Sequence, residues 1–237
     1  MRVLLAGSAK TGNVWVENLL SHIYDLKVLV PPFVPERNIQ SYTDFIEQGL
    51  FEEKSIFHQH FDFSNELCDI SDALPCHIIT VVRNPYDVFT SLYFYIQNFP
   101  TAFIAANNAG SIAIGKSIDH PDVLRFLEEN FRKQLMRSVS WMQSGRALVV
   151  RYEDMHRDAF GTIGNLVEQI EPAHESWIVR AIELCSAARM RKRDEWMEKH
   201  IRSAVIGDWQ NHLSNVHLEI FRSSHADLVE ILGYDVQ

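Results

Sequence analysis

The first fifteen residues constrain the fold of this chain more than any other stretch. Residues 3–6, Val-Leu-Leu-Ala, form an apolar run without alternation, which is typical of a strand buried on both faces of a parallel sheet. Gly7 and Gly12 interrupt this pattern, and apolar residues then recur at helical spacing from Trp15 onward. The stretch therefore predicts a buried strand, a tight loop and a helix in immediate succession.

The tight loop, residues 7–12, has the chemistry of an anion-binding site, and we call it the anion loop. Its backbone N–H groups and the N-terminus of the following helix favour a phosphate-like anion, and Lys10 adds a positive charge. It is not a Walker A motif, because Lys10 precedes the second glycine and Asn13 and Val14 follow it, where that motif has lysine and a hydroxyl residue. The loop thus offers no hydroxyl at the position that would hold Mg²⁺.

Two histidines fall on one face of a second predicted strand, residues 55–61. Side chains at i and i+2 of a strand share a face, so His58 and His60 point the same way. The ordinary interpretation of such a pair is a half-exposed edge with solvated histidines. Its position between two candidate anion-binding segments is the reason to treat both rings as candidate catalytic groups.

The other candidate anion-binding segment begins where the least ambiguous strand, residues 77–82, ends at Arg83. Asparagine and proline then mark the start of a helix over residues 85–97, with Asp87 completing a capping pattern. Ser91 lies on the second turn, so its hydroxyl and Arg83 are expected to reach a common anion. An isolated arginine at a strand end is usually a surface ion-pair partner, and a mid-helix serine is usually inert. The combination of the two residues is therefore stronger evidence for an anion-binding segment than either residue alone.

The remaining pattern alternates strands and helices, which predicts one α/β domain over residues 1–237 with a parallel sheet flanked by helices on both faces. Residues 98–120 show no strong period and are expected to form a loop. The other predicted elements are an extended segment at 27–34, a buried strand at 147–150, and helices at 42–53, 121–143, 161–170, 175–188 and 215–232.

The net charge and the cysteine pattern limit the expected binding partners and the expected cellular compartment. A net charge of −9 argues against a general nucleic-acid or membrane-surface binder, so an anionic ligand needs a local cluster of basic residues. The basic run at 189–193 is expected to be a solvated helix face paired with Asp194, Glu195 and Glu198. Three widely spaced cysteines, the absence of a signal sequence and the absence of an apolar run of membrane-spanning length predict a soluble, cytoplasmic protein.

Four segments, in chain order, resemble the sulfotransferases that use 3′-phosphoadenosine 5′-phosphosulfate (PAPS). Residues 10–15, Lys-Thr-Gly-Asn-Val-Trp, resemble the family's Pro-Lys-Ser-Gly-Thr-Thr-Trp loop, and residues 82–93 match its Val-Arg-Asn-Pro-x-Asp-Val-x-x-Ser-x-Tyr motif. Residues 152–154 and 201–209 resemble two later segments, the second ending in Gly-Asp-Trp. The resemblance implies a three-layer α/β fold of the P-loop nucleotide-hydrolase type, in a short form of the cytosolic-type enzymes, and PAPS-dependent transfer to a hydroxyl of a small molecule.

The resemblance also implies roles for individual residues. His60 is the counterpart of the catalytic base, and Lys10 would stabilise the leaving bisphosphate without a metal. His58 stands where the family has a second lysine, which leaves open which histidine takes the proton. Trp15 and Tyr152 would contact adenine, whereas Arg83, Ser91 and Arg202 would hold the 3′-phosphate. The full set of implied cofactor-binding residues is Lys10, Thr11, Gly12, Asn13, Val14, Trp15, Arg83, Ser91, Tyr152, Arg202, Ser203 and Ala204.

Some positions depart from the family pattern. Asn13 and Val14 replace two threonines, and Ser203 and Ala204 replace Lys-Gly after the arginine. The acceptor wall is expected in residues 98–120, and the acceptor itself is left open. Two alternative functions are also left open: a small-molecule or nucleotide kinase of related fold, which predicts Mg²⁺ dependence, and a non-catalytic protein that binds 3′-phosphoadenosine 5′-phosphate (PAP). No nucleic-acid or membrane partner is expected, and a homodimer is left open.

Overall fold

The computed structural model describes residues 1–30, 39–100, 104 and 109–237. Within these residues the chain divides into two compact units, and each is described by itself. The first, which we call the sheet unit, consists of Met1–Val82 and Arg137–Ser186. The second, which we call the helical unit, consists of Arg83–Met136 and Ala187–Gln237. The expectation of a single domain over residues 1–237 stays a prediction.

The sheet unit contains a five-stranded sheet in the order β2-β3-β1-β4-β5, as far as the described residues show. Every neighbouring pair is parallel, so the predicted parallel α/β sheet is confirmed. β1 is central, and its residues 3–6 are fully buried because β3 and β4 flank its two edges and helices cover both faces of the sheet. The strand bounds are β1 Arg2–Ala6, β2 Lys27–Val28, β3 Ser55–Gln59, β4 Cys76–Val82 and β5 Leu148–Arg151.

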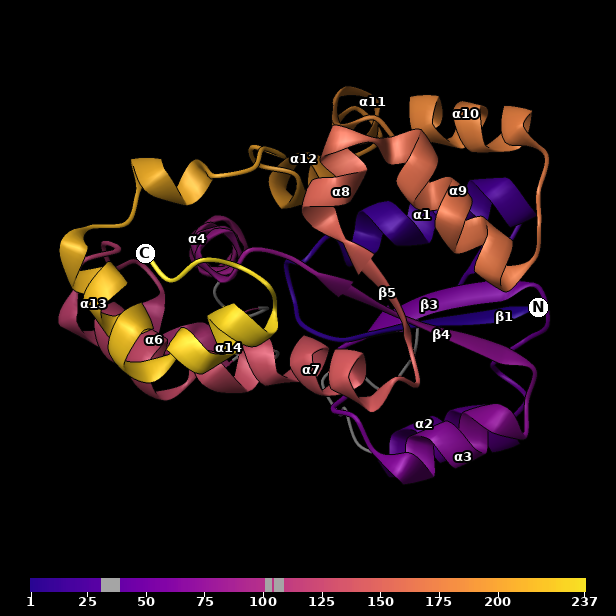
Figure 1. Ribbon diagram of the computed structural model, residues 1–237, viewed down its shortest axis with the longest axis horizontal. Helices are drawn as coiled ribbons and strands as arrows, with labels where there is room; N and C mark the ends of the chain where they lie inside the picture. The colour runs from indigo at the N-terminus through magenta and orange to yellow at the C-terminus, as the bar shows by residue number, and fades with distance from the viewer. Residues whose placement is uncertain (31–38, 101–103, 105–108) are drawn as a thin grey trace. The chain divides into compact units, whose positions relative to one another are not determined.

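Helices cover both faces of this sheet (Figure 1). On one face lie α1 (Asn13–Tyr24), α9 (Ala159–Ile170) and α10 (Glu175–Leu184), and the short α8 (Tyr152–Arg157) connects β5 to α9. On the other face lie α2 (Ile39–Glu47) and α3 (Asn65–Asp72). The sheet unit also holds the C-terminal half of α7 (Phe131–Ser144). This is the layered arrangement that the alternating sequence pattern predicts.

The core beneath α2 and α3 is aromatic. Phe57 of β3 packs edge-on against Phe45 and Phe51 at ring centroid distances of 5.3 and 5.0 Å. Trp141 of α7 is fully buried here, and its indole N–H donates to the carbonyl of Phe61 at 3.0 Å. The indole therefore fixes the chain just beyond β3, where His60 lies.

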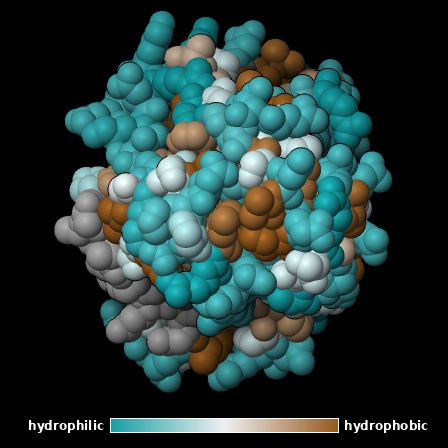
Figure 2. Space-filling view, turned by 90° about the vertical axis from the view of Figure 1, so that its left-hand side faces the viewer, coloured by the Kyte–Doolittle hydropathy of each residue, from teal (hydrophilic) through white to brown (hydrophobic). Residues whose placement is uncertain are grey.

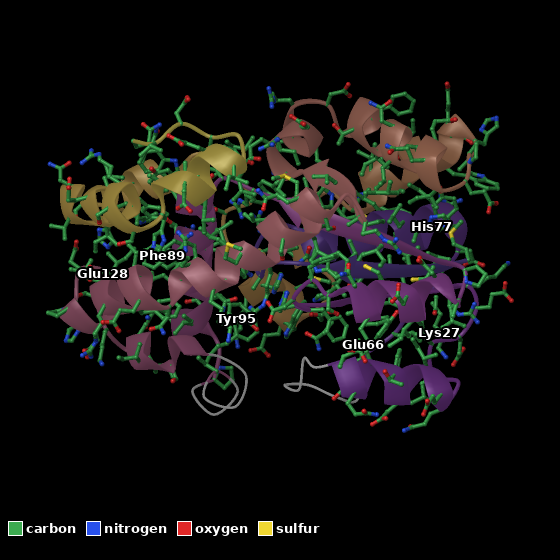
Figure 3. All side chains as sticks on the ribbon, turned by 60° about the horizontal axis from the view of Figure 1, so that its bottom comes forward. Lys27, Glu66, His77, Phe89, Tyr95 and Glu128 are labelled. Atoms are coloured by element: carbon green, nitrogen blue, oxygen red, sulfur yellow. The ribbon has the colours of Figure 1, made fainter. Side chains whose placement is uncertain are left out.

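The helical unit contains, within the described residues, α4 and a set of shorter helices that pack around it. Phe89 of α4, labelled in Figure 3, packs edge-on against Phe131 and Phe221, with ring centroid distances of 5.3 and 6.3 Å. Tyr95, also labelled there, lies further along α4 and packs against Phe99 at 4.3 Å. The bounds are α4 Pro85–Asn98, η1 Ala109–Ala113, α6 Pro121–Glu129, α11 Ala187–Arg191, α12 Glu195–His200, η2 Asp208–Asn211, α13 Asn215–Ser224 and α14 Ala226–Ile231.

The long helices expected at 121–143 and 215–232 are each two helices, so those predictions are wrong about continuity. The first breaks at Asn130, between α6 and α7. Near the end of α6, the ring of His225 donates from Nε2 to the carbonyl of Leu127 at 2.8 Å. His225 is the residue at which the second helix breaks, with φ −136°. One tertiary hydrogen bond thus joins the two interruptions.

Two further helices end earlier than the sequence-based expectation. The helix expected at 42–53 ends at Glu47, because Gly49 takes φ +70° and the N–H of Leu50 donates to the carbonyl of Phe45 at 3.0 Å, a glycine-based helix ending. The helix expected at 175–188 ends at Leu184, and α11 starts separately at Ala187.

The strand expected to be buried at 147–150 is instead an edge strand, β5, and Val149 is 45% exposed. The helix α3 was not expected from the sequence. Within 98–120 the structure describes the end of α4 and η1, whereas 101–103 and 105–108 lie outside the described residues, as do 31–34 of the expected extended segment.

The surface carries scattered large apolar side chains, and one face, shown in Figure 2, is mostly hydrophilic with a compact apolar group near its centre. Among the described residues, no helix has both the length and the apolar character needed to cross a membrane.

Candidate functional site

The anion loop connects β1 to α1 through two glycines that no larger residue can replace without movement. Gly7 takes φ +146°, and a Cβ there would lie 2.6 Å from Thr80 Oγ1 and 2.8 Å from Ser138 Oγ. Gly12 takes φ +112°, and its Cβ would lie 2.7 Å from the ring of Tyr152. Both positions therefore require glycine for backbone conformation and for close approach.

Short polar side chains inside the anion loop hold its shape. The hydroxyl of Thr11 and the amide of Asn13 both donate to the carbonyl of Ser8, at 3.1 and 2.9 Å. Ser8 and Ser138 bind each other reciprocally, because each backbone N–H donates to the other's hydroxyl at 2.9 and 3.1 Å. Thr11 and Asn13, both expected to contact the cofactor, thus bind within the loop in this structure.

The loop ends at the N-terminus of α1, whose first turn contains no acidic residue. Lys10 lies in the loop with φ +65°, and Val14 and Trp15 belong to the first turn of the helix. The partial positive charge of the helix N-terminus is therefore not neutralised by a carboxylate of its own first turn. A helix N-terminus next to a lysine suits a phosphate or sulfate group.

Trp15 and Tyr152, the two expected adenine contacts, lie side by side next to Gly12. Their ring centroids are 5.9 Å apart with an edge-on angle of 73°. His156 completes the group, at 5.1 Å from Trp15 and 4.6 Å from Tyr152. Sequence reasoning missed His156, although it lies four residues after Tyr152 on α8 and therefore on the same face of that helix.

The two histidines of the β3 segment lie next to the anion loop, and neither is simply solvated. His60 Nδ1 is 3.0 Å from the carbonyl oxygen of Gly7, the first residue of the loop. His58 Nδ1 is 3.1 Å from Oε1 of Glu17 on α1, and the two imidazole centroids are 6.0 Å apart. The solvated-edge interpretation is wrong, because β3 lies between β2 and β1 and both rings bind neighbouring elements.

The partners of the two rings impose different chemistry on them. Burial lowers the pKa of His58, but the Glu17 carboxylate outweighs burial and the opposing charge of Lys10, so the net pKa is raised. The Gly7 carbonyl can only accept a hydrogen bond, so His60 Nδ1 carries a proton and the lone pair of the neutral ring lies on Nε2. Sequence reasoning missed Glu17, a buried carboxylate of α1 that no local pattern distinguishes from an ordinary polar helix residue.

In the helical unit, Arg83 and Arg202 are connected through one irregular segment. Arg83 is buried, and its Nη2 donates to the carbonyl of Val205 at 3.2 Å. The guanidinium of Arg202 pairs with Asp208 and lies 4.1 Å from the ring centroid of Phe94. Phe94 follows the half-buried Ser91 by three residues on α4, so Ser91 lies one turn from the aromatic ring that supports Arg202.

Charged side chains hold the backbone of residues 201–209, the 201–209 segment. Arg191 donates from Nε to the carbonyl of Ile201 at 2.8 Å and from Nη2 to those of Arg202 and Ser203 at 3.2 and 3.0 Å. Ala204 follows with φ +54°, in the left-handed region.

Asp87 accepts from the N–H groups of Gly207 and Trp209 at 2.7 and 3.1 Å, while Asn84 caps α4. Asp87, expected as part of the capping pattern of α4, thus also holds the 201–209 segment.

Within the basic run at 189–193, Arg191 takes a role that differs from the expected one. Arg191 binds backbone carbonyls, Glu195 pairs with Lys199, and Asp194 accepts from the N–H of Met197 at 2.7 Å as the N-cap of α12. Arg191 therefore contacts the backbone of the 201–209 segment rather than these acidic side chains. Its targets lie ten to twelve residues away in sequence, where no local pattern reveals them.

The residues expected to bind one nucleotide thus form two groups, each ordered within its own unit. The sheet unit brings together Lys10, Trp15, Tyr152 and the two histidines. In the helical unit, Arg202 belongs to the 201–209 segment and Arg83 binds that segment at Val205. That all of them surround a single ligand stays a prediction. Among the described residues, no group of three or more metal-ligating side chains is gathered.

Comparison with known proteins gives a consistent family relationship. The family model described as "Sulfotransferase domain" matches residues 1–230. Rat (Rattus norvegicus) Sulfotransferase 2A1 is 26% identical over 167 residues, which cover 61% of this chain and 53% of that protein. Mouse (Mus musculus) Sulfotransferase 1E1 is 26% identical over 168 residues, covering 62% and 52%. The chain therefore spans about half the length of the curated relatives it matches.

Solved structures show the same fold. Mouse sulfotransferase SULT7A1, crystallised with PAP, superposes with a TM-score of 0.71 at 17% identity, covering 98% of this chain and 87% of that one. Retinol dehydratase in complex with androsterone and PAP gives a TM-score of 0.62 at 15% identity, covering 100% and 82%.

Proposed function

This chain belongs to the sulfotransferase family, and we propose that it transfers a sulfuryl group from PAPS to a hydroxyl group of a small molecule. The observation that carries this proposal is the contact of His60 with Gly7, at 3.0 Å, which fixes a potential base at the first residue of the anion loop. The PAP bound to the mouse sulfotransferase and to retinol dehydratase supports the choice of cofactor.

We assign the 5′-phosphosulfate to the anion loop, through Lys10 and the backbone of Thr11, Gly12, Asn13 and Val14. The helix N-terminus and the lysine together favour a group with this charge. Adenine is assigned to Trp15 and Tyr152, whose rings contact each other edge-on, with the Tyr152 ring lying against Gly12. The 3′-phosphate is assigned to five residues, Arg83, Ser91, Arg202, Ser203 and Ala204.

The reaction follows from the hydrogen bond of His60. The neutral ring carries its lone pair on Nε2, so Nε2 accepts the proton of the acceptor hydroxyl as its oxygen attacks sulfur. The new S–O bond forms while the bond between sulfur and the bridging phosphate oxygen breaks. Negative charge grows on the departing PAP, and Lys10 stabilises it. Positioning and charge stabilisation supply most of the acceleration, since the protein forms no covalent bond with the sulfuryl group.

Calorimetry with PAP, ADP and ATP, each with and without Mg²⁺, tests the cofactor. We expect metal-independent preference for PAP, and a preference for ATP with Mg²⁺ would instead favour a kinase. Turnover is then measured with PAPS and a panel of hydroxyl acceptors. Lys10→Ala is expected to weaken PAP binding, whereas His60→Ala is expected to keep PAP binding and lose turnover. PAP binding without turnover on any acceptor would favour the non-catalytic alternative.

We propose a cytoplasmic location for the protein. Cys68, Cys76 and Cys185 are all free of disulfides, which fits a cytoplasmic protein. A small-molecule acceptor is the proposed partner, and the oligomeric state is to be measured by light scattering with the same samples.

A further inference from the structure

We infer that His58 supplies a second fixed positive charge to the sulfuryl-donor site, held protonated by the buried carboxylate of Glu17. The role at the donor site rests on the proposed function, whereas the charge state of the ring does not. In this arrangement His58 is not the base, and the two imidazoles work in opposite protonation states.

The geometry of Glu17 carries the inference. Glu17 lies on α1 and is only 5% exposed, and a buried carboxylate is costly unless a partner of opposite charge compensates it. In the part of the chain that the structure describes, His58 is the basic side chain that pairs with it, at 3.1 Å. The ring of His58 is 29% exposed, so it can exchange protons with solvent while its Nδ1 stays on the carboxylate.

The groups that face His58 come from three elements. Glu17 of α1 favours the charged ring, Lys10 of the anion loop opposes it, and burial opposes it as well. His60 lies just beyond the end of β3, and the centroids of the two imidazole rings are 6.0 Å apart. The net result is a raised pKa for His58. An anion bound at Lys10 would remove part of the opposition and would favour the charged ring further.

The contrast with His60 gives the two rings separate tasks. His60 binds a neutral carbonyl through Nδ1, so the lone pair of its neutral ring lies on Nε2, while His58 binds a carboxylate, which retains a proton on the ring. Activity then requires His60 to be neutral and His58 to be charged. Loss of activity toward alkali would then report deprotonation of His58.

The charge state is tested by NMR titration of protein labelled in its histidine rings, with the His58 signal assigned by its loss in His58→Asn. We expect His58 to titrate above 6.5 in the wild-type protein. In Glu17→Gln the ring keeps a hydrogen-bonding neighbour without the charge, so the pKa of His58 should fall and a smaller fraction of the ring should be protonated at a given pH. A wild-type value below 6.5, or the same value in both proteins, overturns the inference.

The role at the donor site is tested by PAP affinity between pH 6 and pH 9, with His58→Lys as the variant whose charge persists over this range. The phosphates of PAP titrate near the lower end, so each Kd is divided by that of His58→Lys at the same pH. We expect the wild-type protein to match His58→Lys at pH 6 and to bind about tenfold more weakly than it at pH 9.

His58→Gln should be weaker throughout, and Glu17→Gln should lose affinity at a lower pH than the wild type. A constant ratio of wild type to His58→Lys, or equal affinities for His58→Lys and His58→Gln, overturns the donor-site role. If no protein binds PAP at any pH, the proposed function fails, whereas the NMR titration still decides the charge of His58.

Discussion

Replacement of Gly12 by alanine is expected to destabilise the protein far more than the same change at another glycine with positive φ. The backbone of Gly12 takes φ +112°, which costs a residue with a Cβ about 1–3 kcal/mol. The new Cβ would also lie 2.7 Å from the Tyr152 ring. That ring is buried and packs against Trp15 and His156, so moving it should cost a further ~1–3 kcal/mol, as in other overpacked cores.

Gly145 provides the matched control. It also lies in the sheet unit and takes φ +67°, but a Cβ there meets nothing within 4 Å. Gly145→Ala should therefore cost only the backbone term, about 1 kcal/mol. Urea unfolding followed by circular dichroism gives the free energy of each variant. We expect Gly12→Ala to lose about 2–3 kcal/mol more than Gly145→Ala.

A double-mutant cycle separates the steric contact from the backbone term. If the ring causes the excess, Gly12→Ala in a Tyr152→Ala background should be less damaging than in the wild type by about 1 kcal/mol or more. Equal losses for Gly12→Ala and Gly145→Ala, or a cycle with no coupling, would refute the argument that Tyr152 closes on the anion loop.

The other predictions concern the 201–209 segment, the buried histidines and the serine pair. Arg191→Lys, which cannot reach three carbonyls with its single ammonium, should weaken PAP binding by about tenfold in calorimetry with little change in kcat. Burial lowers the pKa of His217 and His225, so the unfolded chain binds more protons below about pH 6.5. The unfolding free energy should therefore fall as pH drops through that value, by thermal or urea unfolding. Ser138→Ala leaves the N–H of Ser8 without its hydroxyl acceptor and should lower the unfolding free energy by about 1–3 kcal/mol.

Each of these predictions has a control within the chain. Arg189→Lys, on the same short helix but exposed, should leave PAP affinity unchanged, and an equal loss in both variants would mean that the carbonyl contacts of Arg191 are not what supports PAP binding. The double variant His217→Gln/His225→Gln should flatten the acid side of the stability curve, and an unchanged slope would assign it to other groups. Ser140→Ala removes only a local bond to the Arg137 carbonyl and should cost under about 1 kcal/mol.

The sequence predicts those parts of the fold and site whose signals are local. The β1 run and the two glycines of the anion loop identify the strand, the turn and the helix start because each is specified within a few residues. Asn84 identifies the start of α4 in the same way, since its side chain accepts from backbone N–H groups two and three residues later.

The parts that sequence reasoning missed depend on partners that are distant in the chain. The break at His225 follows from a hydrogen bond to Leu127, 98 residues away, which no helical periodicity contains. Glu17 looks like an ordinary polar residue of an amphipathic helix until β3 places His58 beside it, 41 residues later. Propensity and spacing describe the structure that a segment favours in isolation. The helix break at His225 and the pairing of Glu17 with His58 depend instead on tertiary contacts.

The way the 201–209 segment is held has a consequence for how its sequence can change. Arg191 and Asp87 bind carbonyl oxygens and N–H groups, which almost every amino acid provides, rather than particular side chains. The path of the segment is therefore largely independent of what stands at positions such as Ser203. Substitutions there are free to alter the chemistry presented to a ligand while the main chain keeps its course, and this is how a recognition segment can diversify without being rebuilt.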